Sequence, residues 1–220
     1  MALVVILLGA PGAGKGTQAV RLAQARSLPH VSTGDLLRDH RARGTALGQQ
    51  AQGYMDRGEL VPDALVLDML AQRVAAPDCR EGYVLDGFPR TDVQALALEQ
   101  RLESGDQVRA VNLEVSDESI VARAAGRLSC KNQGCGRVYH ATSAPPRQAG
   151  VCDACGGELY QRADDAAPVV RERLRVYRQK TAPLVDHYSR RGLLTTIDGE
   201  QPPDAVFARL TALIPETVRR

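Results

Sequence analysis

The sequence lacks the basic excess that marks a nucleic-acid-binding domain, because its 28 lysines and arginines nearly balance its 26 acidic residues. The formal net charge is only +2, tryptophan is absent, and aromatic residues make up 4% of the chain. No stretch approaches the roughly 20 apolar residues that a membrane-spanning helix needs. We therefore expect neither nucleic acid nor a membrane as partner. The arginines, which form short clusters in a nearly neutral protein, favour small anionic ligands.

The remaining composition is that of a globular protein. The chain has 220 residues, of which 44% are apolar and 25% charged, enough to form one domain or one domain with insertions. Its start, MALVVILLGAPGAG, lacks the positively charged region of a signal peptide. The β-branched run Leu3 to Leu8 instead predicts a strand buried on both faces. We expect a cytoplasmic protein, and a monomer by default because nothing indicates an oligomer interface.

Further short apolar runs predict a parallel sheet. A glycine-rich turn follows the first strand and leads into a predicted helix from Lys15 to Arg26. Other strands are predicted at 82–86, 108–115 and 193–197, with a possible short strand at 30–32. Because helical stretches separate these runs, parallel βαβ units and an α/β fold are expected.

Two segments interrupt this alternation. Residues 32–61 are polar and mostly helical in pattern, and residues 126–165 contain four cysteines, several glycines and a Pro145-Pro146 pair. Both are predicted to be insertions at the ends of strands, where α/β folds place their ligands. The core would then comprise residues 1–31, 62–125 and 166–220.

The run GAPGAGKGT, Gly9 to Thr17, matches the phosphate-binding pattern G-x-x-x-x-G-K. Glycines let backbone N–H groups turn toward phosphate oxygens, and the helix that follows points its positive dipole end at the same anion. Lys15 adds a full charge at the transferring phosphoryl group. Thr17 stands one position later than the usual hydroxyl residue, which weakens the prediction that it binds Mg²⁺ directly. The alternative is a glycine-rich turn with a solvated lysine.

Four motifs in order resemble the adenylate kinase family, in particular its long-lid bacterial type. They are GAPGAGKGTQ, STGDLLR at Ser32–Arg38, DGFPRT at Asp86–Thr91, and RADD at Arg162–Asp165. The resemblance covers nearly the whole chain and implies a P-loop kinase core with a five-stranded parallel sheet flanked by helices and two inserted mobile subdomains. It also implies reversible phosphoryl transfer from MgATP to AMP, giving two ADP. The insertion at 32–61 would cover the monophosphate, and that at 126–165 the triphosphate.

The resemblance assigns roles by motif. The residues expected to contact ATP are Gly12, Ala13, Gly14, Lys15, Gly16, Thr17, Arg123, Arg127, Val138 and Tyr139. Those expected to contact AMP are Thr33, Arg38, Met55, Val61, Gly87, Arg90, Gln94, Arg162 and Arg173. The expected catalytic set is Lys15, Asp86, Arg90, Arg123, Arg162 and Arg173.

The residue types suit these roles, because phosphoryl transfer depends on positioning and charge neutralisation, and arginine binds phosphate oxygens in two-point fashion. Arg173 falls beside a predicted buried helical stripe, where an ion pair is the alternative explanation. The spacing of Arg123 and Arg127 predicts that they share one helical face, which could also be an exposed basic face. Asp86 ends a predicted strand and could hold Mg²⁺ through water or cap the strand.

Two further predictions concern a pair of acidic residues, which could bind arginines, and a glutamine, which could contact adenine. Asp164 and Asp165 could brace neighbouring arginines or pair at a hinge. Gln94 offers both a donor and an acceptor, as an adenine edge requires, although a glutamine on a helix is usually a surface residue.

Four cysteines form two pairs, Cys130 with Cys135 and Cys152 with Cys155. The spacing within each pair is that of structural Zn²⁺ sites, and a glycine after each pair allows a tight turn. Four thiolates leave no open coordination position, so the metal would stabilise the lid. The first pair is two residues wider than in many zinc-bearing members of the family. Free thiols or two disulfides are the alternatives, and iron could replace zinc. Cys79 is expected to be a small buried apolar residue.

Other functions remain possible from the sequence. A UMP/CMP kinase, or a kinase that uses GTP as donor, would share the fold, although Thr33 and Gln94 favour AMP. A zinc-ribbon nucleic-acid-binding or assembly module would have a vestigial nucleotide site, but the lysine and arginines that phosphoryl transfer needs are all present.

Overall fold

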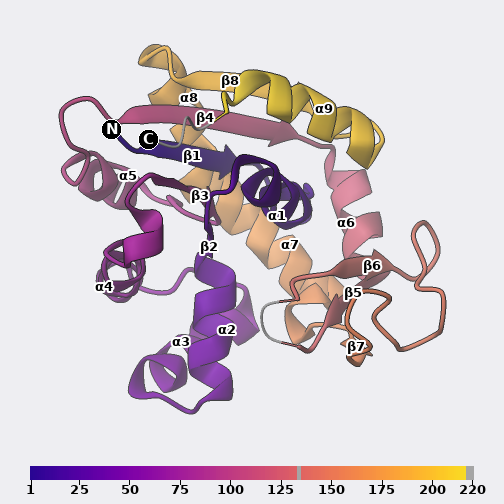
Figure 1. The fold of residues 1–220 in the computed structure, drawn as a ribbon. Coiled ribbons are helices and arrows are strands. Elements are labelled where there is room, and N and C mark those ends of the chain that lie inside the picture. The colour runs from indigo at the N-terminus through magenta and orange to yellow at the C-terminus, as the bar shows by residue number, and fades with distance from the viewer. Residues whose placement is uncertain (133–134, 217–220) are drawn as a thin grey trace.

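A five-stranded parallel sheet forms the centre of the computed structural model, which describes residues 1–132 and 135–216 (Figure 1). Across the sheet the order is β2-β3-β1-β4-β8, and every pair is parallel. The strands span His30–Ser32 (β2), Gly82–Asp86 (β3), Leu3–Leu8 (β1), Gln107–Glu114 (β4) and Leu194–Asp198 (β8). The α/β fold and its five predicted strands are confirmed, with the ends of β4 and β8 shifted by one residue.

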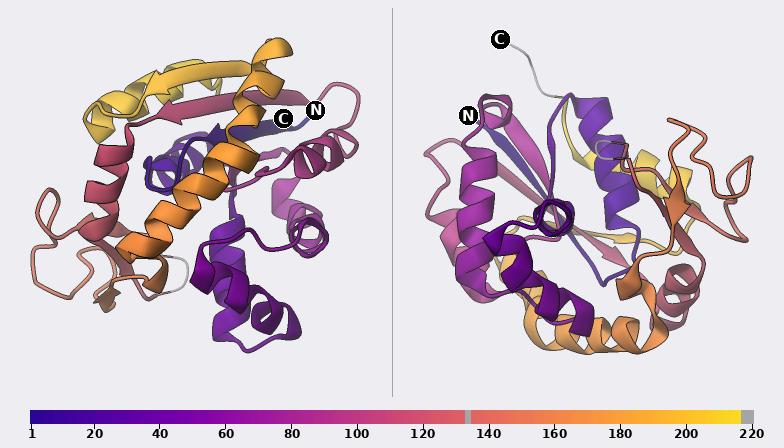
Figure 2. Two further views of the ribbon diagram at one scale, coloured as in Figure 1. Left: turned by 180° about the vertical axis from the view of Figure 1, so that it is seen from behind. Right: turned by 90° about the horizontal axis from the view of Figure 1, so that it is seen from below.

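Both faces of the sheet are buried, as the apolar run in β1 predicted. Val4, Ile6 and Leu8 pack into one cluster and Leu3, Val5 and Leu7 into another, because successive side chains of a strand point to opposite faces. Helices cover the first face: α4 (Asp63–Val74), α5 (Asp92–Glu99) and α8 (Pro183–Arg190). The other face is covered by α1 (Lys15–Arg26) and α9 (Pro203–Leu213). In Figure 2, left, which views the molecule from behind, the orange α7–α8 segment crosses in front of the sheet.

Two lobes extend from the central sheet (Figure 1). One lobe consists of α2 (Thr33–Ala42) and α3 (Ala46–Arg57). Outside this lobe, a 3₁₀ turn at Pro77–Cys79 follows α4. The other lies between α6 (Asp117–Ala125) and α7 (Ala167–Val176). It contains a small antiparallel sheet of order β6-β5-β7, with strands at Val138–His140, Arg127–Cys130 and Leu159–Tyr160, followed by a 3₁₀ turn at Ala163–Asp165. The sequence did not predict these three strands, which are only two to four residues long.

The expectation that Arg123 and Arg127 share a helical face was wrong. Helix α6 ends at Ala125, and Arg127 is the first residue of β5. The chain turns at Gly126, where a Cβ would approach the ring of His140 to 2.3 Å. The tight packing of that ring against the backbone explains why the helix stops there.

A π-helical turn joins α7 to α8 at Tyr177–Thr181, where the N–H of Ala182 donates to the carbonyl of Tyr177 at 2.8 Å. Pro183 comes directly after Ala182. A proline inside a helix clashes with the carbonyl four residues before it. The widened turn relieves that clash. The predicted apolar stripe nevertheless continues across it, since Leu174, Thr181, Leu184 and Tyr188 are buried. No helix in the described part of the chain is long and apolar enough to cross a bilayer.

Candidate active site

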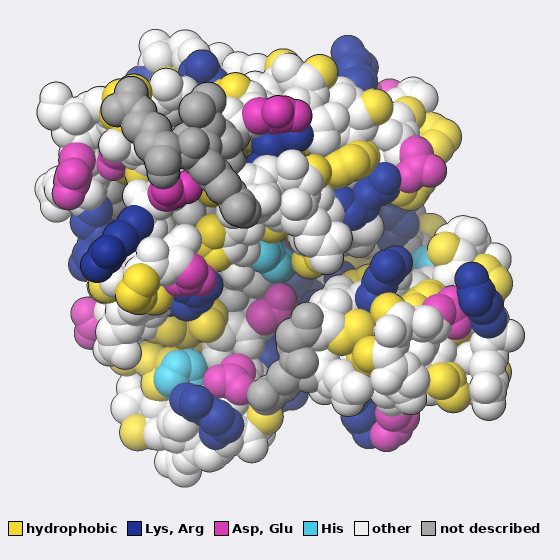
Figure 3. All heavy atoms as spheres, viewed as in Figure 1, with side chains coloured by type: hydrophobic (Ala, Val, Ile, Leu, Met, Phe, Trp, Pro, Cys, Tyr) yellow, Lys and Arg dark blue, Asp and Glu magenta, His cyan; other side chains and the backbone are white. Residues whose placement is uncertain are grey.

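One cleft of about 1650 Å³ lies at the carboxyl end of the sheet, between the two inserted lobes. Figure 3 shows a hollow between the α2–α3 lobe and the β5–β7 lobe, with basic and acidic side chains visible in it. The cleft is larger than the roughly 300–1,000 Å³ of a typical small-molecule pocket. It is lined by every residue predicted to contact a nucleotide: Gly12, Ala13, Gly14, Lys15, Gly16, Thr17, Thr33, Arg38, Met55, Val61, Asp86, Gly87, Arg90, Gln94, Arg123, Arg127, Val138, Tyr139, Arg162 and Arg173.

The glycine-rich loop between β1 and α1 adopts a conformation that other residues rarely adopt. Gly12 has φ 90° and Gly14, the residue before α1, has φ 94°. At Gly9 a Cβ would approach the Leu113 carbonyl oxygen to 2.6 Å. These three positions therefore require glycine, and the loop that they shape ends at the positive N-terminal end of α1.

Lys15 lies over this loop and donates to the carbonyl oxygens of Gly9, at 2.7 Å, and Ala10, at 2.8 Å. Burial lowers the pKa of its ammonium group from 10.5 to about 8, and the nearby Asp86 carboxylate only partly offsets this. In the nucleotide-free protein, burial therefore destabilises the protonated form of Lys15. An anion in the loop would stabilise that protonated form.

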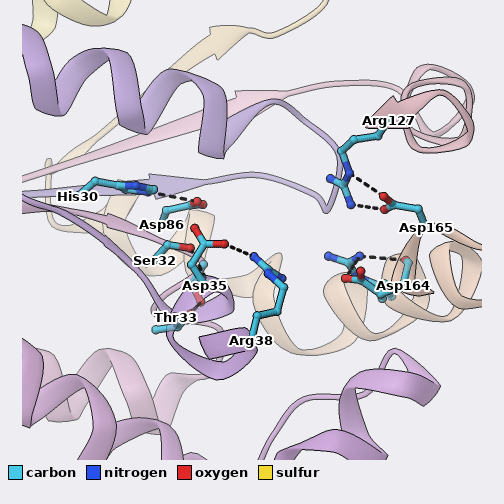
Figure 4. Close-up of polar contacts among 11 residues, drawn as sticks. His30, Ser32, Thr33, Asp35, Arg38, Asp86, Arg127, Asp164 and Asp165 are labelled. Carbon is cyan, nitrogen blue, oxygen red and sulfur yellow. Dashed lines mark hydrogen bonds and ion pairs between the residues drawn. The ribbon is translucent and has the colours of Figure 1, made fainter. Parts of the chain in front are cut away.

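Asp86 ends β3, and its carboxylate points toward His30 (Figure 4). Burial opposes its ionisation, but His30, Lys15 and Arg90 together keep the pKa of Asp86 below its ordinary value. His30 Nε2 lies 3.5 Å from Asp86 Oδ2, and the sequence analysis did not single out this histidine. A Cβ on Gly16 would lie 3.3 Å from the same carboxylate oxygen. This close approach explains why glycine separates Lys15 from Thr17.

On the other side of the cleft, hydrogen bonds hold the loop after β3. Thr33 Oγ1 and Arg90 Nε both donate to the Gly87 carbonyl, at 2.8 and 2.7 Å. Thr181, in the π-helical turn, donates through Oγ1 to the Arg90 carbonyl at 2.9 Å. The sequence analysis missed this role of Thr181, because a threonine in an apolar stripe gives no sign of a partner 91 residues away.

Gln94 lines the cleft although only 2% of its surface is exposed. Its Oε1 accepts from the Arg90 N–H at 2.8 Å, and its Nε2 donates to Asp63 Oδ1 at 2.7 Å. An amide has two N–H groups and two oxygen lone pairs. One donor and one acceptor of Gln94 therefore remain for a base.

Arginines from distant parts of the chain line the cleft. Arg38 pairs with Asp35 at 2.5 Å, and Arg173 pairs with Asp164 at 2.8 Å (Figure 4). Arg162 Nε is buried and has no hydrogen-bond partner among residues 1–132 and 135–216. Burial lowers the pKa of Arg173 to about 10. For Arg90 and Arg162 too, burial is the largest cause of a lowered pKa.

The predicted bracing roles of the acidic pair are confirmed. Asp164 pairs with Arg173, and Asp165 accepts two hydrogen bonds from Arg127, of which that from Nε is 2.9 Å long. The Arg127–Asp165 pair joins the first and last segments of this lobe. Arg123 Nη2 donates to the Gly199 carbonyl at 2.9 Å, which ties α6 to the end of β8.

The four lid cysteines form one cluster, and all four Sγ atoms lie within 4.8 Å of one another. Cys130 and Cys155 are 3.4 Å apart and Cys135 and Cys152 are 3.6 Å apart, and none of them forms a disulfide. A tetrahedral site with Zn–S bonds of ≈ 2.3 Å separates its sulfur atoms by about 3.8 Å.

Side chains around this cluster contact two of its sulfur atoms. The Asn132 Nδ2 donates to Cys155 at 3.3 Å, and the Tyr139 hydroxyl lies 3.5 Å from Cys152. The hydrogen bond with Tyr139 lowers the pKa of Cys152 to about 6, whereas burial raises the pKa of Cys135 and raises that of Cys130 to about 12. The clustering of the four Sγ atoms, rather than their pKa values, is what fits a metal ion. Cys79 is buried as predicted, and its Sγ also accepts from Arg73 Nη1 at 3.1 Å.

Comparison with known proteins gives one consistent family. The model of the family described as adenylate kinase matches residues 7–193. A curated adenylate kinase from Symbiobacterium thermophilum is 52% identical over 98% of this chain and 98% of its own length. Adenylate kinases from Lachnospira eligens and Archaeoglobus fulgidus are 50% and 49% identical, each over 96% of this chain and over 99% and 97% of their own lengths.

The depressed pKa of Lys15 predicts how triphosphate binding varies with pH. The affinity for ATP should fall about tenfold per pH unit above about pH 8, because the free protein must first regain the proton that the phosphates require. Titration calorimetry at pH 7, 8, 9 and 10 measures this, and Lys15→Met should bind ATP weakly without that alkaline limb. A wild-type affinity that stays constant to pH 9.5 would contradict the assignment.

The same shift has a consequence for stability. Between about pH 8 and 10.5 the unfolded chain holds the Lys15 proton more tightly than the folded protein does. The contribution of this group to the free energy of unfolding should therefore rise with pH in that window and be unfavourable below it.

Proposed function

The chain belongs to the adenylate kinase family, and we propose that it carries out that family's reaction by direct in-line transfer within the cleft. It transfers a phosphoryl group from ATP to AMP, giving two ADP. The observation that carries the mechanism is the continuity of the cleft, which joins the glycine-rich loop to a second group of buried cations around Arg90. Two nucleotides placed there would have their phosphates toward each other.

The donor nucleotide would bind on the side of the lid. The backbone N–H groups of the loop and Lys15 would hold the β- and γ-phosphates, and Arg123 and Arg127 would contact the triphosphate from α6 and β5. Val138 and Tyr139, on β6, would line the site of the base. Thr17 and Gly12 to Gly16 complete the proposed ATP site.

The acceptor would bind between the α2–α3 lobe and the loop after β3. Thr33 and Arg38 would hold AMP, Arg90 would bind its phosphate, and Gly87 and Gln94 would contact the adenine. Met55 and Val61 supply apolar surface on the same side. Arg90 is held in place from both ends, by Gln94 at its N–H and Thr181 at its carbonyl.

Arg162 and Arg173 would contact the phosphoryl group as it passes between the two nucleotides, together with Arg123 and Lys15. No side chain needs to act as nucleophile or strong base, because charge stabilisation supplies most of the rate enhancement in phosphoryl transfer. The unpaired Nε of Arg162 and the lowered pKa of Arg173 support this role, since both groups gain from an added anion.

Closure of two mobile lobes would exclude water, which otherwise accepts the phosphoryl group. The lobes are residues 32–61 over the monophosphate and 126–165 over the triphosphate, attached to a core of residues 1–31, 62–125 and 166–220. The Arg127–Asp165 pair joins the first and last segments of the lid, and the Arg173–Asp164 pair joins the end of the lid to α7. We infer that the lid moves about the points where these two pairs hold it.

Two metals belong to this proposal. Mg²⁺ bound with ATP neutralises phosphate charge, and Asp86 would hold it through water. Zn²⁺ would stabilise the lid, held by Cys130, Cys135, Cys152 and Cys155, since four clustered thiols with tetrahedral spacing fit this ion. We further infer a cytoplasmic monomer whose partners are ATP, AMP and ADP, with no nucleic acid or membrane among them.

The acceptor side is tested by Arg90→Ala. This change should raise the KM for AMP by about 100-fold while the Kd for MgATP stays within about twofold, because Arg90 faces the acceptor. Steady-state kinetics and ATP calorimetry measure the two quantities. Arg101→Ala, at an exposed position, serves as control. Equal losses for both nucleotides would contradict the proposed division of the cleft.

The lid metal is tested by elemental analysis and chelation. The protein should contain one zinc per chain, and its removal should lower the melting temperature by roughly 6–12 °C, which corresponds to about 3 kcal/mol for a chain of this size. Hydrogen exchange should increase within residues 126–165. Cys155→Ser should lose the metal, whereas Cys79→Ser should retain it. Stoichiometric iron, or a chelated protein of unchanged stability, would refute the zinc assignment.

A further inference from the structure

A carboxylate outside the cleft holds the side chain proposed to read the acceptor base. Asp63, in the first turn of α4, accepts hydrogen bonds from Gln94 Nε2 at 2.7 Å and from Thr91 Oγ1 at 3.1 Å. Thr91 is the N-cap of α5, and its Oγ1 also accepts from the Gln94 N–H at 3.2 Å. Asp63 itself is not among the residues that line the cleft. The direct route from Asp63 to a bound nucleotide is therefore through Gln94.

The two partners of Gln94 fix the orientation of its amide. An ionised carboxylate only accepts hydrogen bonds, so Asp63 requires the NH₂ group on its side. A backbone N–H only donates, so Arg90 requires the carbonyl oxygen on the opposite side. Rotating the amide by 180° would place an oxygen against a carboxylate and an NH₂ group against an N–H. Both contacts would be repulsive in a site from which water is excluded.

A fixed amide discriminates between purines. Adenine presents an acceptor at N1 beside a donor at the 6-amino group, whereas hypoxanthine and guanine present a donor at N1 beside an acceptor at O6. The remaining N–H and oxygen lone pair of Gln94 can match only one of these two orders at a given base position. A glutamine free to rotate could match both, because its two ends exchange roles.

We propose that Asp63 is a specificity-determining positioning residue, which locks the Gln94 amide in the orientation that pairs with adenine and rejects 6-oxopurine monophosphates. This inference rests on the proposed contact between Gln94 and the acceptor base. It assigns the selectivity to a pair of groups, Asp63 and the Arg90 N–H, rather than to Gln94 alone.

The test compares AMP with IMP as acceptors for Asp63→Asn. Asparagine keeps the size of the side chain but offers both a donor and an acceptor, so only the Arg90 N–H would still oppose the reversed amide. The ratio of kcat/KM for AMP to kcat/KM for IMP should fall about tenfold, in part through a gain for IMP. The KM for ATP should stay constant. Asp68→Asn, at an exposed position on the same helix, should leave the ratio unchanged.

Gln94→Ala separates the two levels of the inference. If Gln94→Ala weakens AMP use and Asp63→Asn lowers the ratio, the proposal holds. If Asp63→Asn raises the KM for AMP and IMP equally, so that the ratio is unchanged, Asp63 merely supports α4 and α5 and the proposal is overturned. If Gln94→Ala leaves the KM for AMP unchanged, the base contact itself fails, and the role of Asp63 fails with it.

Discussion

Buried positive charge is the constraint on which the site depends. Lys15 and several arginines lie together at the end of the sheet, where burial lowers the pKa of Lys15 to about 8 and that of Arg173 to about 10. Asp86 and Asp164 offset only part of this charge. The nucleotide-free protein therefore carries an electrostatic strain that phosphate oxygens relieve, and the same cations are then in place for the charge of the transition state.

The fold holds these charges in place with neutral groups and with distant acids. Backbone carbonyls accept from Lys15 and Arg90, which positions both cations without neutralising them. Acidic side chains from the base of the lid pair with Arg127 and Arg173, so lid position and cation position are linked. The π-helical turn places Thr181 against the loop of Arg90. Positioning and charge are thus supplied by different parts of the chain.

Local patterns in the sequence were enough to predict the sheet, the phosphate loop and the cysteine cluster. Each rests on neighbouring residues: the run Leu3–Leu8, the glycines before Lys15, and the paired cysteines. The sequence did not predict partners that depend on tertiary approach, such as Asp63 with Gln94 or His30 with Asp86. It also misplaced Arg127, because residues four apart share a helical face only if the helix continues, and here the packing of His140 against Gly126 ends it.

The most direct test of the account is the binding of a bisubstrate compound, two adenosines joined through five phosphates. If the cation cluster is shared by two nucleotides whose phosphates meet, this compound should bind at least about 100-fold more tightly than ATP alone, because linking makes the second contact intramolecular. Calorimetry of the wild-type protein measures both affinities. A bisubstrate affinity no better than that of ATP would show that the cleft does not hold two nucleotides in line.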